Sequence, residues 1–217
     1  MTTDFQLTRR LMHDFASIDD PKGRRRTGLF VAEGTKCVLE LAVAFSCEYL
    51  FASPEWLSKN GAAMNAATVA AASPRMLRDL TRLSATPPVI AFFRIPQAQE
   101  APSPSLPGSD LVLALDRIQD PGNLGTILRT CDWMGIHTVV ASPDTVDAFN
   151  PKAVQSTMGA LARVNIIYTD LPRWLGSLPG TVPVYGTFLD GDNIYTSPLA
   201  KAGVIVMGTK AGEFPIR

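Results

Sequence analysis

The sequence predicts an α/β protein of two domains joined by a linker. Its 217 residues are enough for two small cores, and apolar residues make up 46% of the chain. Apolar runs of strand length alternate with helical patterns through most of the sequence. Residues 96–109 interrupt this alternation with four prolines and three serines, a composition typical of a linker. We therefore expect one domain at residues 1–95 and a second at residues 110–217.

Composition excludes several classes of protein. With 18% charged residues beside this apolar content, the chain is not an extended disordered protein. No stretch approaches the ~18 uninterrupted apolar residues of a membrane helix, and the N-terminus lacks the apolar core of a secretory signal. The cysteines have no metal-like spacing and are typical of a reducing compartment; they are Cys37, Cys47 and Cys131. We expect a cytoplasmic protein with neither a membrane segment nor a metal site.

The N-terminal domain combines a helical opening, a basic loop, and alternating strands and helices. The loop concentrates four cations ahead of the first strand: Lys22, Arg24, Arg25 and Arg26. Apolar runs predict strands at 28–32, 47–52 and 89–93. An apolar helical face predicts a helix at 34–46, and Pro54 begins another. Ser73-Pro74 fits an N-cap with proline at the first helical position and predicts a helix at 73–83. Residues 1–95 carry a net charge of +3 and the remainder −3, so the positive excess lies in this domain.

The C-terminal domain alternates more regularly. Apolar runs predict strands at 111–115, 137–141, 164–168, 182–185 and 203–207. Helical patterns predict helices at 124–134, 150–158 and around Trp174. Strand–helix–strand repetition at this spacing implies a parallel sheet with right-handed crossovers. Ligands of such sheets bind beyond the carboxyl ends of the strands, so candidate sites lie in the turns at 116–125, 186–193 and 208–213.

The turn at 116–125 and the helix after it carry the most informative pattern. They match neither the Gly-x-Gly-x-x-Gly dinucleotide fingerprint nor a phosphate-binding loop with Gly-Lys-Ser/Thr. Asn123 lies near the helix start and Arg129 six residues further on. Gly122 and Gly125 allow a backbone or a ligand to come close. From the residues alone, two interpretations stay open: Asn123 caps the helix and Arg129 pairs with a surface carboxylate, or both serve a site.

Four separated runs of the chain carry a resemblance to one protein family. They are NLGTILRTCD at 123–132, PKAVQSTMGA at 151–160, YGTFLDG at 185–191, and GLFVAEG at 28–34 after the basic loop. In the same order, and over residues 9–208, they resemble the SpoU/TrmH (SPOUT) RNA 2′-O-ribose methyltransferases. The first resembles the family's first signature motif, the second an internal stretch that usually reads Ser-x-Gly-Ala, and the third the strand end that meets the adenosyl group. The fourth is similar to the family's N-terminal substrate-binding domain.

The resemblance implies both a fold and a function. It implies an N-terminal domain with the fold of ribosomal protein L30e and a C-terminal parallel-sheet domain tied in a trefoil knot. S-adenosylmethionine is the implied methyl donor and a homodimer the implied working unit. RNA is the implied acceptor, 23S ribosomal RNA first and transfer RNA as the nearest alternative. Asn123 and Arg129 match the catalytic Asn and Arg of the first motif. The positions implied to bind the cofactor are Thr187, Phe188, Leu189, Gly191 and Gly208.

Roles in RNA binding and catalysis are expected for a few side chains. Arg24, Arg25 and Arg26 are expected to contact RNA phosphates, with a solvated loop as an equal alternative. Glu33 matches the Glu-Gly pair that follows a strand in the family, and serves either binding or structure alone. The Arg129 guanidinium stays protonated, so we expect it to stabilise charge and orient a phosphate rather than abstract a proton.

The C-terminus departs from the family pattern. After the last strand the family usually continues Gly-Asn-Glu-Gly, whereas this chain reads GTKAGEFPIR, with Lys210 at the position of the usual glutamate. The third motif, which completes the knot and the cofactor pocket in the family, does not follow. Loss of one adenine from AAC-GAA-GGC produces Thr-Lys-Ala, so we expect a one-base frameshift that truncated a longer enzyme and left the knot incomplete. The alternatives are a catalytically inactive RNA-binding remnant and, more distantly, a nucleotide-binding α/β protein.

Overall fold

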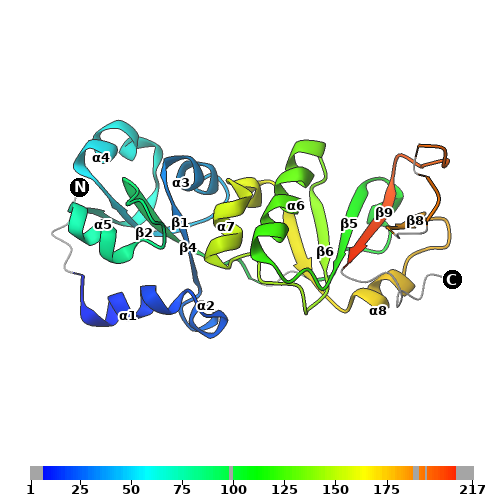
Figure 1. Cartoon of the computed structure of the whole chain (residues 1–217), viewed down its shortest axis with the longest axis horizontal. Coiled ribbons are helices and arrows are strands. Elements are labelled where there is room, and N and C mark those ends of the chain that lie inside the picture. The colour runs from blue at the N-terminus through cyan, green and yellow to red at the C-terminus, as the bar shows by residue number, and fades with distance from the viewer. Residues whose placement is uncertain (1–6, 98–99, 188–190, 194, 209–217) are drawn as a thin grey trace. The chain divides into compact units, whose positions relative to one another are not determined.

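A computed structural model describes residues 7–97, 100–187, 191–193 and 195–208, and it confirms the α/β fold class. The chain divides into two compact units (Figure 1). Unit 1 comprises residues 1–97 and 147–162, and unit 2 comprises residues 98–146 and 163–217. The first boundary falls within the predicted linker. The sequence-based division at residue 110 did not anticipate that residues 147–162 pack within unit 1.

Unit 1 is built on a mixed sheet of four strands in the order β1-β4-β2-β3. Its strands are β1 (Leu29–Glu33), β2 (Cys47–Ala52), β3 (Ala66–Ala71) and β4 (Val89–Arg94). Strand β4 runs antiparallel to both neighbours, whereas β2 and β3 are parallel. The sequence did not assign β3: its apolar stretch at 66–72 is mostly alanine, which has a low preference for strands, and this edge strand buries only Ala70.

Six helices accompany this sheet in the described part of unit 1. They are α1 (Arg9–Ser17), α2 (Pro21–Thr27), α3 (Thr35–Leu41), α4 (Pro54–Asn60), α5 (Pro74–Leu80) and α7 (Pro151–Thr157). The Ser73 side chain caps α5, as the Ser73-Pro74 pair predicted, and Ser53 caps α4 in the same way. Short 3₁₀ segments lie at Gly61–Ala63 and Ala160–Ala162.

The predicted basic loop is instead a helix, α2. The Asp20 carboxylate accepts a hydrogen bond from the Lys22 amide at 2.8 Å, and Pro21 occupies the first helical position. Gly28 ends the helix in the left-handed region, with φ of 66°. The Asp-Pro pair was therefore a start signal, as the Ser-Pro pairs were. A helix fixes the directions of the three arginines, which a loop would leave free.

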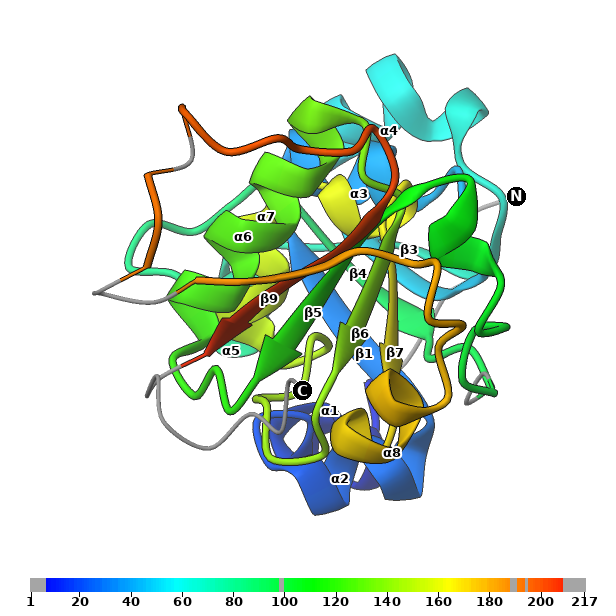
Figure 2. The same cartoon turned by 90° about the vertical axis from the view of Figure 1, so that its right-hand side faces the viewer.

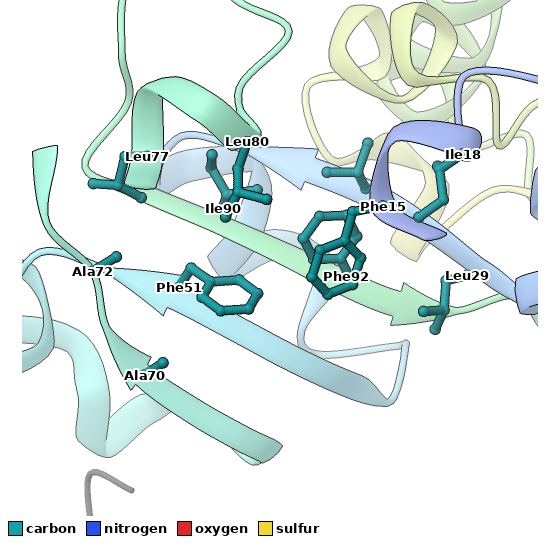
Figure 3. Packing of buried hydrophobic residues seen from close by; sticks show 11 residues of the cluster. Phe15, Ile18, Leu29, Phe51, Ala70, Ala72, Leu77, Leu80, Ile90 and Phe92 are labelled. Atoms are coloured by element: carbon teal, nitrogen blue, oxygen red, sulfur yellow. The ribbon is translucent and has the colours of Figure 1, made fainter. Parts of the chain in front are cut away.

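Aromatic side chains dominate the core of unit 1 (Figure 3). Phe15 of α1 stacks on Phe92 of β4, with ring centroids 3.9 Å apart, and meets Phe51 of β2 edge-on at 5.6 Å. Leu77 and Leu80 of α5 belong to the same buried cluster. These contacts fasten α1 and α5 to one face of the sheet.

A second group of rings holds residues 147–162 within unit 1. The ring centroids of Phe149 and Phe30 of β1 are 4.9 Å apart, and the Phe30 ring also contacts those of Phe45 and Phe93. Helix α7 packs against β1, as Figure 1 shows. Because this segment buries its apolar side chains here, it clusters with unit 1 although its neighbours in the sequence belong to unit 2.

Unit 2 is a parallel sheet of five strands, in the order β7-β6-β5-β9-β8 (Figure 2). Its strands are β5 (Leu111–Asp116), β6 (Thr138–Ala141), β7 (Asn165–Tyr168), β8 (Val184–Gly186) and β9 (Gly203–Gly208). Its helices are α6 (Pro121–Met134) and α8 (Leu171–Gly176). All four strand pairings are parallel, as the alternation of strands and helices predicted.

Both faces of this sheet are covered, which explains why β5 is an unbroken apolar run. Val112 and Ala114 pack with Leu171 and Trp174 of α8 on one face. Successive side chains of a strand point to opposite faces, so Leu113 lies on the other face, where α6 runs (Figures 1 and 2).

Residues 100–109 of the predicted linker are part of unit 2. Trp174 donates from its indole nitrogen to the Pro102 carbonyl oxygen at 2.9 Å. Leu106 packs against the α8 cluster, and Pro107 is buried in a 3₁₀ segment at Leu106–Gly108. Part of the proline-rich stretch is therefore anchored to unit 2 by Pro102, Leu106 and Pro107, although most of its described residues are exposed.

Some sequence expectations fall outside the structure. Residues 209–217, including Lys210, lie outside the described residues, and the trefoil knot stays a prediction. No helix in the described ranges is long and apolar enough to cross a membrane. Among the same residues, no three His, Cys, Asp or Glu side chains gather as metal ligands would.

Candidate functional site

The carboxyl ends of β5, β9 and β8 form one edge of the unit 2 sheet. Asp116 at the end of β5 is paired in register with Gly208 at the end of β9. The Thr187 amide and hydroxyl both donate to the Val206 carbonyl oxygen, at 3.1 and 3.2 Å. The structure therefore brings Thr187 and Gly208, both predicted cofactor positions, to the same edge. Gly191 is exposed, whereas Phe188 and Leu189 lie outside the described residues.

A hydroxyl network holds the turn that leads from β5 to α6. Arg117 adopts a positive φ of 53°, and its amide donates to the Ser142 hydroxyl at 2.9 Å. The Ile118 amide donates to the Thr145 hydroxyl at 3.3 Å, and the Val146 amide donates to the Ile118 carbonyl at 2.8 Å. The turn after β6 thus fixes the turn after β5. Sequence reasoning missed these residues, for which the only signal was hydroxyl side chains directly after a buried strand.

The first turn of α6 resolves one of the open alternatives. The Asp120 carboxylate accepts from the Asn123 amide at 2.8 Å, and Pro121 takes the first helical position. Asp120, not Asn123, is therefore the N-cap. The Asn123 side chain is exposed, one turn into a helix that begins at the carboxyl edge of the sheet.

Arg129 lies on the same helix, about 9 Å further along its axis at the rise of an α-helix. Its side chain is exposed, and no carboxylate in the described ranges pairs with it. Neither Asn123 nor Arg129 forms a side-chain hydrogen bond with any residue whose position the structure gives. Both are available to a ligand, so the interpretation as cap and surface ion pair does not hold.

These two residues belong to one exposed face of α6. Its members recur at helical spacing and include Asn123, Thr126, Arg129, Thr130, Trp133 and Met134. The opposite face is buried and carries Leu124, Leu128 and Cys131. Trp133 is 90% exposed and Met134 70% exposed. Two large apolar side chains therefore border the polar residues of the site.

Of the three arginines expected to meet RNA, Arg24 is buried, with 1% of its surface exposed. Its guanidinium donates to the Asp147 carboxylate at 2.7 Å and to the Ile18 carbonyl oxygen at 2.7 Å. The expectation of a phosphate contact is corrected for Arg24: burial and these bonds commit it to structure. Arg25 is exposed, and Arg26, also exposed, forms an ion pair with Asp14 at 2.6 Å.

Glu33 is buried at the end of β1. Its carboxylate accepts a hydrogen bond from the Thr81 hydroxyl and a bifurcated one from the Arg82 amide, whose nitrogen lies 3.0 and 3.2 Å from the two carboxylate oxygens. Arg82 in turn donates to Asp19 at 2.7 Å and to the Phe15 carbonyl oxygen. Glu33 therefore has the structural role that was one of its two expectations, because it holds the turn after α5.

The stretch that resembles Ser-x-Gly-Ala has a steric explanation. Gly159 adopts φ of 97°, and a Cβ atom added there would lie 2.5 Å from the Glu40 Cβ. Only glycine fits this conformation and this close approach to α3. The Thr157 hydroxyl, fully buried, donates to the Val154 carbonyl oxygen at 2.7 Å and closes the turn.

Asp132 and the three cysteines have structural rather than reactive surroundings. Arg163 binds Asp132 with two nearly parallel hydrogen bonds of 2.8 Å and so lowers the pKa of that carboxyl. Burial raises the pKa of the Cys131 thiol to about 11. Burial likewise raises the pKa values of Cys37 and Cys47 to about 12. None of these thiols is a nucleophile at neutral pH.

Comparison with known proteins accounts for both units. The model of the SpoU rRNA methylase family matches residues 110–211, and that of the MRM3-like substrate-binding domain matches residues 12–91. The 23S rRNA (guanosine(2553)-2'-O)-methyltransferase RlmP of Bacillus subtilis is 35% identical over 111 residues, which are 50% of this chain and 45% of that protein. The chain spans about half the length of the curated relatives it matches.

Solved structures resemble nearly the whole chain. A Porphyromonas gingivalis protein assigned to the TrmH family of RNA methyltransferases is 32% identical, with a TM-score of 0.81 over 94% of this chain and 82% of that one. The AdoMet-bound rRNA methyltransferase of Sinorhizobium meliloti is 26% identical, with a TM-score of 0.76 over 98% of this chain and 82% of that one. Family matches in both halves of the sequence and a shared fold agree, and the chain therefore belongs to the SpoU/TrmH family of methyltransferases.

Proposed function

We propose that this protein transfers a methyl group from S-adenosylmethionine to the 2′-hydroxyl of a ribose in RNA, with 23S ribosomal RNA as the substrate. The observation that carries the proposal is the pair Asn123 and Arg129, exposed and without side-chain partners in the described residues, on the helix that begins at the carboxyl edge of the sheet. Relatives named as rRNA 2′-O-methyltransferases, and the methylase match over residues 110–211, support the same reaction.

The edge at Thr187 and Gly208 fits an adenosyl group. Gly186 and Gly208 have no side chains to cover the backbone there, so a flat ring can approach it. The S-adenosylmethionine bound there supplies an electrophilic methyl group on a sulfonium. In our proposal, Thr187, Gly191 and Gly208 bind and orient the adenosyl end, together with Phe188 and Leu189.

Arg129 and Asn123 act on the acceptor. A ribose hydroxyl is a weak nucleophile at neutral pH, and negative charge develops on its oxygen as it attacks. The Arg129 guanidinium stays protonated, stabilises that charge and orients a neighbouring phosphate. The Asn123 amide holds the ribose or the guanidinium from the first turn of α6.

The two units divide the work in this proposal. Unit 1, which contains the substrate-binding match, binds RNA, and Arg25 and Arg26 lie on the exposed surface of α2. Unit 2 carries out the transfer in the cytoplasm, where ribosomal RNA is found. We extend the proposal to a homodimer, because the exposed Trp133 and Met134 on α6 are typical of a surface that a partner covers.

The experiment is transfer of tritium from methyl-labelled S-adenosylmethionine, with unmodified 23S rRNA and total tRNA in separate reactions. The proposal predicts incorporation into 23S rRNA that depends on Asn123 and Arg129. Incorporation into tRNA alone would keep the chemistry and overturn the substrate. Salt-sensitive RNA binding with no incorporation into either would identify an inactive RNA-binding protein and overturn the enzymatic proposal.

A further inference from the structure

Unit 1 contains an open pocket of about 410 Å³ that none of the proposed roles uses. One wall comes from the end of β1 and the turn after α5, with Val31, Glu33, Arg82 and Leu83. The facing wall comes from residues 150–156, at and within α7. Five of the lining residues fall in the substrate-binding match at 12–91 and five in the methylase match at 110–211.

The first wall is rigid. The Glu33 carboxylate is held by Thr81 and by the Arg82 amide, as described above. The Arg82 guanidinium is held by Asp19 and by the carbonyl oxygens of Leu80 and Phe15. Both charged side chains named on this wall therefore have protein partners, and the wall supplies a fixed shape with apolar surface from the half-buried Leu83.

The α7 wall offers hydrogen-bonding groups. Asn150 accepts from the Lys152 amide at 2.9 Å through its oxygen, which leaves its NH₂ group to donate. The Ser156 hydroxyl donates to the Lys152 carbonyl oxygen at 2.8 Å, which leaves its lone pairs to accept. The half-buried Gln155 makes no hydrogen bond through its amide within the described ranges, so it can offer both a donor and an acceptor.

We propose that this pocket binds one unpaired nucleotide of the RNA substrate. Its volume lies at the lower end of the range for small-molecule sites, about 300–1,000 Å³, which suits a single nucleotide. A base has apolar faces and a polar edge, and the pocket pairs the half-buried apolar side chains of Leu83 and Pro151 with the amide of Gln155. A base within a duplex cannot enter such a site, so the ligand is single-stranded. The inference rests on the proposed function.

The test is fluorescence anisotropy of the full chain with a labelled 12-nucleotide single-stranded RNA of mixed sequence, beside the same RNA as a duplex. We expect Gln155→Ala to weaken binding of the single strand about tenfold, the equivalent of one lost hydrogen bond. Gln155→Glu keeps the size of the side chain, adds a negative charge and should weaken binding further. Gln97→Ala, at an exposed glutamine of unit 1 that does not line the pocket, is the matched control and should bind like the unsubstituted protein.

The outcomes separate the pocket from the proposed function. If both Gln155 variants bind the single strand as the unsubstituted protein does, the proposed nucleotide site is wrong and the proposed methyltransferase function is unaffected. Equal binding of duplex and single strand would also overturn it. Failure of the unsubstituted protein to bind either RNA would overturn the proposed function and the pocket together. Calorimetric titration with S-adenosylmethionine should give the same affinity in all variants, which shows that unit 2 is intact.

Discussion

The Arg24 guanidinium donates to the Asp147 carboxylate across 2.7 Å and joins residues 123 positions apart in the sequence. Arg24 is buried, and within the described residues Asp147 is the one carboxylate that forms an ion pair with it. Its Nη2 atom has no hydrogen-bond partner in the same residues. Since Asp147 begins the segment 147–162, this ion pair fastens the segment to unit 1. Two further chain connections, at 146–147 and 162–163, therefore link the units besides the predicted linker.

Asp147→Asn is expected to destabilise the protein by about 2 kcal/mol, because it leaves a buried guanidinium without its counter-charge. This destabilisation is smaller than that expected for a fully buried ion pair, because the Asp147 side chain is 36% exposed. Urea denaturation followed by circular dichroism measures this loss of stability. Asp144→Asn, at an exposed position three residues earlier in the sequence, is the control. Equal unfolding midpoints for the two variants would contradict a stabilising ion pair at Asp147.

Substitution of either of the two α6 residues should slow turnover strongly without affecting stability. Asn123→Ala and Arg129→Ala are each expected to lower kcat for methyl transfer about 10²–10³-fold, as loss of a charge-stabilising donor does. Arg129→Lys should recover little, because an ammonium lacks the planar fork of a guanidinium. Thr181→Ala, at an exposed threonine of unit 2 outside α6, serves as control in single-turnover measurements. A normal rate in Asn123→Ala would remove Asn123 from the proposed mechanism.

The exposed apolar end of α6 predicts self-association. Light scattering after size-exclusion chromatography should give twice the chain mass for the unsubstituted protein, and the mass of one chain for Trp133→Asp/Met134→Asp. Val43→Asp, at a residue 87% exposed in unit 1, should leave the dimer intact. If the double variant remains dimeric, another surface must form the interface.

The Asp132–Arg163 pair predicts a small dependence of stability on pH. Because the folded-state pKa of Asp132 is lowered below its ordinary 3.8, the pair stabilises the fold above about pH 4. This contribution is lost as pH falls through the lowered pKa, and its size is about 1 kcal/mol for so exposed a pair. The free energy of unfolding should be higher at pH 6 than at pH 3, and Asp132→Asn should reduce this difference by the contribution of the pair. An unchanged pH profile in that variant would contradict the assignment.

Much of unit 2 could be predicted from the sequence. Strands buried on both faces, such as β5, are unbroken apolar runs, and their order along the chain indicates a parallel sheet. Asn123 and Arg129 could be selected because they stand in a recognisable motif. Ser73 could be assigned as a cap because a serine before a proline has few other uses at a helix start.

The remainder depends on contacts between distant parts of the chain. Arg24 is one of three consecutive arginines, and only the fold distinguishes the buried one from its exposed neighbours. The placement of residues 147–162 depends on Phe149 meeting Phe30, a pairing without local signal. The pocket between β1 and α7 follows from that placement, so no motif could have indicated it. Asp120 and Asn123 are both common N-cap residues and lie three positions apart. Asp120 is the N-cap of α6, because the proline that follows it fits the first helical position.

The most direct test of the proposed reaction is the chemical position of the transferred methyl group. After reaction with methyl-tritiated S-adenosylmethionine, the RNA is hydrolysed in alkali, which cleaves at every ribose with a free 2′-hydroxyl. The proposal predicts tritium in an alkali-resistant dinucleotide, and none when Arg129 is replaced by alanine. Tritium recovered in a mononucleotide, which means methylation of a base, would contradict 2′-O-ribose transfer by this chain.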